Sequence, residues 1–388
     1  MNNFQFYNPT RIIFGEGSIA KLQELIPIQS RVLMLYGGGS IKKNGVYQQV
    51  TDALREHELF EFGGIEPNPE YTTLMKAVQL VRENQIDFLL AVGGGSVIDG
   101  TKFVAAAALY QGEDPWDIVG QGLGPGLKEV LPVGTVLTLP ATSSEMNNKG
   151  VISYREKGRK KSFTSDKIFP KFSILDPKTT YSLPQKQVRN GLVDAYIHVL
   201  EQYLTYPVGG TMQDRQSEAL LMTIHDIAPA VLKMDPPDYT ARANYMWVCT
   251  NALNGLIGMG VPQDWSTHGI GHALTVLYGL DHAESLAVVL PWLLWYKREQ
   301  KQDKLLQYGS RVLGQNSKDP AEQIDKTIEA LSAFFHSLGM PTKLTAYGLD
   351  PDKVAEEMQK QLEDEKFTRG EHRDITPAAA AAILRLSR

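Results

Sequence analysis

The sequence contains a single cysteine, Cys249, among its 388 residues. An intrachain disulfide is therefore excluded, and a cytoplasmic compartment is the simplest expectation. Long hydrophobic runs are also absent, since the longest, residues 286–295, spans about half a membrane and contains Pro291. The first residues lack a basic start followed by an apolar stretch, so we expect neither a signal peptide nor a membrane anchor.

Strong charge of either sign is missing as well. The formal net charge is −5 at pH 7, the sequence pI is about 6.0, and no long basic run occurs. These values give no reason to expect nucleic acid as a partner. With 43% hydrophobic residues the chain can bury a sizeable core, and its length makes two domains the default expectation.

Strand-like and helical patterns alternate in the first part of the chain. Strands are predicted at 11–14, 32–36, 88–92, 133–139 and 172–175, and helices at 72–83 and 100–110. This alternation is typical of a mostly parallel sheet covered by helices on both faces. We therefore predict an α/β dinucleotide-binding domain over residues 1–182.

The strand signal fades after this point. Helical spacing is found at 184–204, 211–232, 239–257, 320–338 and 351–362. Prolines at positions 184, 320 and 351 stand where a helix would begin, a position that tolerates proline. The second predicted domain, residues 183–388, is therefore all-α.

Two copies of Gly-Gly-Gly-Ser, at 37–40 and 93–96, follow two of the predicted strands. Strand, glycine loop and helix in succession direct backbone N–H groups at one point, which suits phosphate. One such loop could merely shape a turn, but two favour a ligand. Residues 95–102 approach a P-loop, yet Thr101 precedes Lys102 where Lys-Ser/Thr is required, which argues against a kinase or ATPase.

No acidic residue follows the strand at 32–36 to bind a ribose 2′-hydroxyl. Ser40, Lys42 and Lys43 follow instead. A hydroxyl and nearby lysines accommodate a 2′-phosphate, which favours NADP(H) over NAD(H).

Histidines and one aspartate make a candidate metal site. Asp194 and His198 lie four residues apart in a helical pattern, as do His268 and His272, and His282 follows shortly after. The other histidines lack a partner at metal-ligand spacing. Imidazole and carboxylate suit Fe²⁺ and Zn²⁺ equally, and the spacing alone leaves five possible donors.

At this point the chain resembles a known family, the iron-containing (group III) alcohol dehydrogenases. The resemblance rests on residues 66–69 (Glu-Pro-Asn-Pro), 93–102 (Gly-Gly-Gly-Ser-Val-Ile-Asp-Gly-Thr-Lys) and 138–142 (Thr-Leu-Pro-Ala-Thr), and on the spacing of the aspartate and histidines. It runs over nearly the whole chain and is strongest to bacterial NADPH-dependent aldehyde reductases and butanol dehydrogenases. It implies the dehydroquinate synthase-like fold, in which an α/β domain precedes a helical domain.

The resemblance also implies roles for individual residues. The metal, Fe²⁺ or Zn²⁺, would be held by Asp194, His198, His268 and His282, which leaves His272 as the catalytic group near the nicotinamide. Contacts to NADP(H) would come from Gly38, Gly39, Ser40, Asn68, Gly94, Gly95, Ser96, Asp99, Thr138, Thr142, Asn147 and Lys160.

Two positions depart from the family pattern. Ser143 stands where a glycine is expected, and Ala283 follows His282 where many members have glycine. The first departure could reshape the nicotinamide or substrate pocket, while neither removes a metal ligand.

The expected reaction is reduction of short- to medium-chain aldehydes to primary alcohols, and the reverse, in a cytoplasmic homodimer. The metal would polarise the carbonyl, and His272 or a water chain would deliver the proton. One alternative is a metal- and NAD-dependent lyase of the dehydroquinate synthase type, but residues 251–290 contain no lysine or arginine for its anionic substrate. A nucleotide- or metal-binding protein without turnover is the other.

Overall fold

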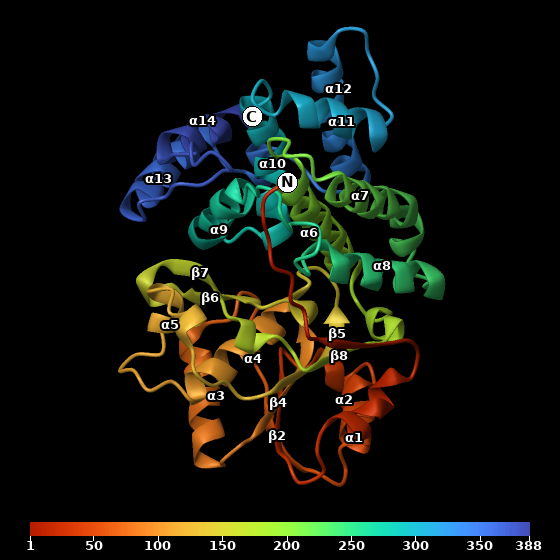
Figure 1. Cartoon of the computed structure of the whole chain (residues 1–388), viewed down its shortest axis with the longest axis vertical. Coiled ribbons are helices and arrows are strands. Elements are labelled where there is room, and N and C mark those ends of the chain that lie inside the picture. Colours follow the sequence, from red (N-terminus) through yellow and green to blue (C-terminus); the bar gives the residue numbers. More distant parts are fainter. The chain divides into compact units, whose positions relative to one another are not determined.

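The computed structural model describes all residues, 1–388, and divides into two compact units (Figure 1). The α/β unit comprises residues 7–188 and 233–254, and the helical unit comprises residues 1–6, 189–232 and 255–388. No helix is long and apolar enough to cross a membrane.

The α/β unit is built on a six-stranded parallel sheet with the order β1-β8-β5-β4-β2-β3. Its strands are β1 (Arg11–Phe14), β2 (Arg31–Tyr36), β3 (Glu58–Phe62), β4 (Phe88–Gly94), β5 (Val133–Leu139) and β8 (Phe172–Leu175). The five predicted strands are all present. β3, which lies at the sheet edge and is only partly buried, is additional because its mixed sequence Glu-Leu-Phe-Glu-Phe gives a weak strand signal.

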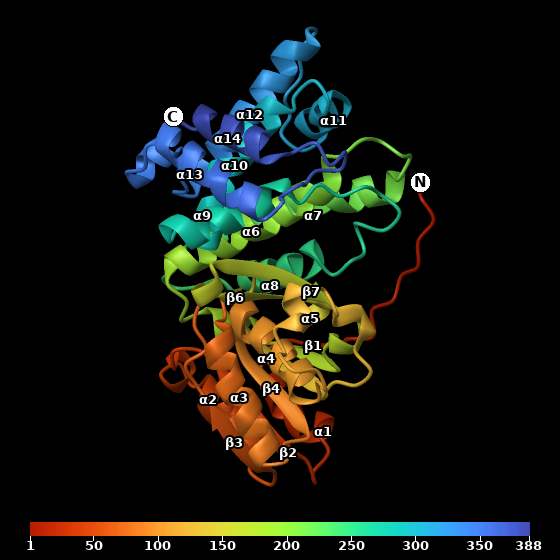
Figure 2. The ribbon, with the colours of Figure 1, turned by 90° about the vertical axis from the view of Figure 1, so that its left-hand side faces the viewer.

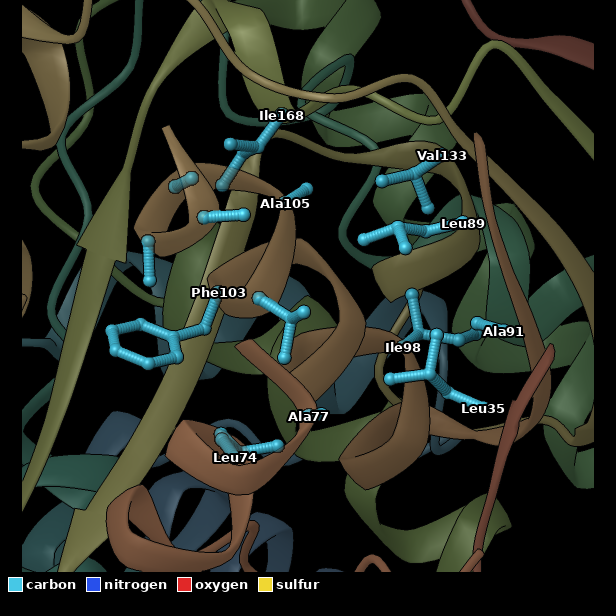
Figure 3. Packing of buried hydrophobic residues seen from close by; sticks show 14 of the residues in the cluster. Leu35, Leu74, Ala77, Leu89, Ala91, Ile98, Phe103, Ala105, Val133 and Ile168 are labelled. Atoms are coloured by element: carbon cyan, nitrogen blue, oxygen red, sulfur yellow. The ribbon is translucent and has the colours of Figure 1, made fainter. Parts of the chain in front are cut away.

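Side chains alternate between the two faces of the sheet because successive residues of a strand point in opposite directions. On one face, Leu35, Leu89, Ala91 and Val133 pack against α3 (Tyr71–Glu83) and α4 (Gly95–Ala108), as Figure 3 shows. On the other face, Met34, Leu90 and Val92 pack with residues of α1 (Leu22–Leu25) and α2 (Val46–Ala53). Both faces are covered, which explains why the central strands are almost wholly apolar.

The strand order reverses between β2 and β4. The chain passes from β2 outward to β3 and then returns to place β4 on the other side of β2. Open α/β sheets bind ligands at such a reversal, beyond the carboxyl ends of the strands. The two Gly-Gly-Gly-Ser sequences begin at the carboxyl ends of these two strands, so the fold brings both loops to the reversal.

The rest of the α/β unit contains elements that the sequence reading did not predict. A two-stranded antiparallel sheet joins β6 (Lys149–Tyr154) to β7 (Arg159–Thr164), and α5 (Asp117–Gly120) is a single turn. Five of the six residues of β7, Arg-Lys-Lys-Ser-Phe-Thr, are polar or charged. Phe163 is its one large apolar residue, so the sequence gives little sign of a strand.

The helical unit confirms the predicted all-α second half. It contains α6 (Gln185–Tyr203), most of which lies in this unit, followed by α7 (Thr211–Val231), α9 (Ser266–Tyr278), α10 (His282–Tyr296), α11 (Gln302–Arg311), α12 (Pro320–Ser337), α13 (Pro351–Asp364) and α14 (Pro377–Leu386). Figure 2 shows α13 and α14 side by side, as Figure 1 does. Pro320 and Pro351 each occupy a first helical position after an aspartate cap, as predicted.

One helix differs from the predicted division at residues 182 and 183. Helix α8 (Tyr239–Ala252) follows the helical stretch in sequence but belongs to the α/β unit. Tyr245 donates to the carbonyl of Pro140 at 2.6 Å, and Thr250 donates to the carboxylate of Glu145 at 2.6 Å. These buried bonds attach α8 to the segment after β5, a pairing between distant positions that helical spacing cannot reveal.

Candidate metal and cofactor sites

The predicted metal ligands come from three helices of the helical unit. Asp194 and His198 lie one turn apart on α6 and project from the same face. His268 stands in the first turn of α9, and His282 is the first residue of α10.

A short turn returns α10 towards the start of α9. Gly279 ends α9 with a φ of 69°, a left-handed conformation that glycine adopts without steric cost. Asp281 and Glu284 form a capping box at the start of α10, in which Glu284 accepts a hydrogen bond from the backbone N–H of Asp281 at 3.3 Å. These local signals place His282 where its ring centroid lies 5.3 Å from that of His268.

Three of the four side chains, the imidazoles, surround one carboxylate oxygen of the fourth. Oδ1 of Asp194 lies 3.7 Å from Nδ1 of His198, 3.7 Å from Nε2 of His268 and 3.7 Å from Nε2 of His282. Donors bound to zinc at the corners of a tetrahedron lie about 3.3–3.6 Å apart. The spacing therefore fits a divalent metal in their midst, and donor atoms of Asp194, His268 and His282 all lie within 4.8 Å of one another.

Burial and charge support the same interpretation. Asp194 is 4% exposed and His268 is 8% exposed, and neither Oδ1 of the first nor Nε2 of the second has a hydrogen-bond partner. Burial would raise the pKa of Asp194, but the neighbouring imidazoles outweigh it and hold that pKa well below its usual range. A buried anion faced by three imidazoles is a site prepared for a cation.

Sequence reasoning missed one carboxylate beside this site. Glu201 lies on α6 seven residues after Asp194, which places it on the same helix face, and its side chain contacts His268. Burial alone would lower the pKa of His268, but Glu201 and Asp194 outweigh it and raise that pKa to about 9. The helical spacing of Asp194, His198 and Glu201 was the signal that could have identified it.

His272 is not among the three residues whose donor atoms lie within 4.8 Å of one another, Asp194, His268 and His282, and neither is His198. Its ring centroid is 6.2 Å from that of His268 and 5.3 Å from that of His282, and its side chain is partly exposed. The catalytic role of His272 stays a prediction, because its ring lies as close to His282 as the ring of His268 does.

The two glycine loops differ in what surrounds them. A Cβ built on Gly38 or Gly39 meets nothing within 4 Å, and Gly39 has a φ of +87°. A Cβ on Gly95 would come within 2.5 Å of Thr142 Oγ1, and one on Gly94 within 2.9 Å of Leu139 Cβ. The second loop therefore needs glycine to pack against the segment after β5, whereas Gly38 faces open space.

Two residues predicted to bind the cofactor form hydrogen bonds within the protein. Asp99 is buried and accepts hydrogen bonds from Ser144 Oγ at 2.5 Å and from the N–H of Val151 at 2.9 Å. The amide of Asn147 accepts from Lys102 and donates to the carbonyl of Leu253 at 3.3 Å. Both side chains thus bind the segment that follows β5, and their contact with the cofactor stays a prediction.

Lys102 is the centre of this buried network. Its ammonium donates to Ser144 Oγ, to the carbonyl and side-chain oxygens of Asn147, and to the carbonyl of Lys149, at 2.8–3.1 Å. Burial lowers the pKa of Lys102 to about 8, although Asp99 and Glu145 act in the opposite direction. The lysine that is displaced from a P-loop position thus points into the protein.

The other predicted cofactor residues lie around the same reversal of the sheet. Ser96, at the start of α4, accepts a hydrogen bond from the backbone N–H of Asn68 at 3.2 Å. Thr138 lies near the end of β5, and Thr142 Oγ1 accepts from the N–H of Ser144 at 3.2 Å. Lys160 on β7 is close enough to Asp99 to lower the pKa of that carboxyl, although burial of Asp99 acts more strongly and raises it.

Sequence comparison identifies the family. The model of the iron-containing alcohol dehydrogenases matches residues 9–177, and the model of the C-terminal part of this Fe-containing family matches residues 189–387. The chain belongs to the iron-containing alcohol dehydrogenase family. The resemblance found in the motifs is thereby confirmed, and with it the predicted fold class.

Relatives in this family match the chain from end to end. The NADPH-dependent aldehyde reductase YqhD of Escherichia coli (strain K12) is 53% identical over 390 residues, with 100% of both chains covered. The probable NADH-dependent butanol dehydrogenase 1 of Bacillus subtilis (strain 168) is 40% identical over 392 residues, again with 100% of both covered. Because the names of these two relatives specify different nicotinamide cofactors, family membership alone does not decide the preference.

Solved structures of this family agree. The crystal structure of Escherichia coli K-12 YqhD matches with a TM-score of 0.97 at 52% identity and covers 100% of this chain and 99% of that chain. NADH-dependent butanol dehydrogenase A from Thermotoga maritima matches with a TM-score of 0.91 at 35% identity, with coverage of 100% and 99%.

The departure from the family pattern at Ser143 has a structural explanation. Its φ is +53°, the conformation for which glycine is favoured. The buried hydroxyl donates to the carbonyl of Cys249 at 2.5 Å and accepts from the N–H of Leu253 at 2.8 Å. The serine hydroxyl thus binds the end of α8, and an effect of this residue on the nicotinamide or substrate pocket stays a prediction.

Proposed function

We propose that this protein reduces short- to medium-chain aldehydes to primary alcohols with NADP(H), and catalyses the reverse oxidation. The observation that carries the proposal is the set of donors around Asp194 Oδ1, in a member of the iron-containing alcohol dehydrogenase family. The name of the 53% identical relative from Escherichia coli supports both the aldehyde substrate and the cofactor.

Four side chains would hold the metal, Fe²⁺ or Zn²⁺: Asp194, His198, His268 and His282. When bound, the metal supplies a Lewis acid for the carbonyl oxygen, and NADPH supplies the hydride. His272 lies beside these ligands with a partly exposed ring, so it is the group of this chain best placed to deliver the proton.

The loop after β2 supports NADP(H) over NAD(H). Ser40 and Lys43 are exposed there, and no carboxylate follows the strand directly. Glu61 on the neighbouring strand β3 pairs with Lys42 at 3.3 Å and accepts a hydrogen bond from the hydroxyl of Tyr36 at 3.1 Å. A neutralised acid does not repel a 2′-phosphate, and an exposed hydroxyl and ammonium attract it.

The decisive experiment compares metal-loaded and metal-free protein. With acetaldehyde, butanal or octanal, the loaded enzyme should oxidise NADPH and release the corresponding alcohol, identified by gas chromatography. The metal-free protein should bind NADPH without turnover. His336→Ala serves as the matched control, because that histidine bonds to Thr342 away from the donors and its loss should leave turnover intact.

Two results would contradict the proposal. Full activity in protein verified to be free of metal would exclude the assigned role of the donors. Absence of alcohol with every aldehyde, despite bound metal and NADPH, would favour a lyase or a protein without turnover.

Assembly and location complete the proposal. We expect a homodimer, which multi-angle light scattering would test, and a cytoplasmic location. The cytoplasmic location rests on the presence of a single cysteine, Cys249, which is buried and forms no disulfide.

A further inference from the structure

Glu201 has an unusual set of partners for a buried carboxylate. The residue is 3% exposed, and its Oε1 accepts a hydrogen bond from the backbone N–H of Thr267 at 2.6 Å. Its Oε2 accepts from the backbone N–H of His268 at 3.3 Å and also contacts Nδ1 of the same imidazole. One carboxylate therefore binds both the first turn of α9 and the ring of a proposed metal ligand.

The contact with the ring determines which imidazole nitrogen is available. An ionised carboxylate only accepts hydrogen bonds, so Nδ1 of His268 must carry the proton. With Nδ1 protonated, the nitrogen left to bind a metal is Nε2, the atom that is 3.7 Å from Asp194 Oδ1 and has no hydrogen-bond partner. Carboxylate–histidine–metal arrangements of this kind fix the tautomer and orientation of the ligand.

We propose that Glu201 is a positioning residue that commits His268 to bind the metal through Nε2. The inference rests on the proposed metal-dependent function and adds to it a residue outside the ligand set. Because the same carboxylate caps α9, it also fixes the helix that carries the ligand relative to α6, which carries Asp194 and His198.

An amide cannot replace this carboxylate. The groups around the two oxygens of Glu201 are all donors, namely two backbone N–H groups and the ring Nδ1. Glutamine has one acceptor oxygen and one NH₂ donor group, so its NH₂ group must face another donor. If the NH₂ group faces Nδ1, the ring proton moves to Nε2 and the ligand atom is blocked, which is the tautomer error expected of an Asp or Glu to amide exchange.

Asp264 provides a matched control at the same helix end. It accepts from the N–H of Ser266 at 3.0 Å and pairs with Lys301 at 2.7 Å, and no hydrogen bond joins it to the imidazole of His268. In Asp264→Asn the amide oxygen can still cap α9, and Lys301 retains its ion pair with Glu371, at 2.7 Å. The two variants therefore separate helix capping from control of the ring.

The first test measures zinc affinity by competition with a chromophoric chelator. Replacing a partner of a metal-ligating histidine typically weakens metal binding 10–100-fold, roughly the loss expected in Glu201→Gln. Asp264→Asn should stay within about threefold of the unsubstituted protein, and Glu201→Asp should recover part of the loss. Equal affinity in Glu201→Gln and the unsubstituted protein would overturn the inference, as would an equal loss in both amide variants.

The second test needs no variant of Glu201 to fold. Ring ¹⁵N resonances of the zinc-loaded, unsubstituted protein report which nitrogen carries the proton, and the His268 signals are assigned by their loss in His268→Ala. We expect a protonated Nδ1 and a metal-bound Nε2, and the reverse arrangement would refute the inference. If the unsubstituted protein binds no zinc at all, the proposed function itself fails, which this experiment distinguishes from failure of the role of Glu201.

Discussion

Ser143 allows two opposing effects on stability to be measured separately. The residue holds a φ of +53°, and its buried hydroxyl bonds to the carbonyl of Cys249 and the N–H of Leu253. Ser143→Gly removes both bonds and relieves the backbone strain. Ser143→Ala removes both bonds and keeps the strain, so the difference between the variants isolates the backbone term.

The magnitudes follow from these contacts. Two hydrogen bonds contribute about 2 kcal/mol together, which both variants lose. In the glycine variant, relief of the left-handed conformation stabilises the fold by about 1–2 kcal/mol. The greater freedom of glycine in the unfolded chain offsets about 0.5–1 kcal/mol of this gain. The expected order of stability is serine, then glycine, then alanine, with alanine about 2 kcal/mol below the original protein.

Thermal unfolding monitored by circular dichroism tests this order. For a unit of this size, 1 kcal/mol corresponds to roughly 2–4 °C in Tm, so Ser143→Ala should unfold about 4–8 °C lower. The KM for aldehydes should not change, because the hydroxyl is directed at α8. An alanine variant as stable as the original protein would show that the two hydrogen bonds contribute nothing, and the reasoning would be wrong.

Further predictions concern the site and the pH dependence of stability. His198→Ala should lose both metal and turnover while NADPH binding persists, whereas His272→Ala should keep one metal per chain and lose kcat; equal metal loss in both would make His272 a ligand. Gly39→Asp should lower the kcat/KM ratio of NADPH over NADH by at least about tenfold, equivalent to about 1.4 kcal/mol, and an unchanged ratio would remove this loop from the ribose. Burial lowers the pKa of His225 from its ordinary value near 6.5 to about 4 in the folded protein. Between these two pH values only the unfolded chain gains the proton, so the stability of the fold decreases as the pH falls through this range. His225→Gln, which can still bond to Tyr196, should flatten this slope of Tm against pH, and an identical slope would exclude His225 as its cause.

The features that the sequence predicted well are those set by local pattern. Apolar runs ended by glycine gave the central strands, and four-residue spacing gave the helix faces that carry Asp194 and His198. The turn that brings His282 close to His268 was also predictable from the sequence. Gly279 readily ends a helix, because glycine adopts the left-handed conformation that other residues disfavour.

The features that it did not predict depend on contacts between distant positions. Helical spacing shows that one face of α8 is buried, but the hydrogen bonds from Tyr245 and Thr250 decide that it is buried in the α/β unit. In the same way, the motif match that assigned Asp99 to the cofactor did not reveal the hydrogen bonds that its carboxylate accepts from Ser144 and Val151. A motif records which residue type is needed, and only the fold shows which atoms it serves.

The two Gly-Gly-Gly-Ser sequences show that identical motifs can have different surroundings in the fold. Their sequences are identical, and both follow adjacent strands at the reversal of the sheet. Yet Gly95 is required because Thr142 fills the space of a side chain, while Gly38 has empty space where a side chain would lie. Packing alone therefore accounts for the glycine at position 95 and leaves the one at position 38 unexplained. The close approach of a ligand would account for a missing side chain in this open loop, and that prediction is the one tested by Gly39→Asp.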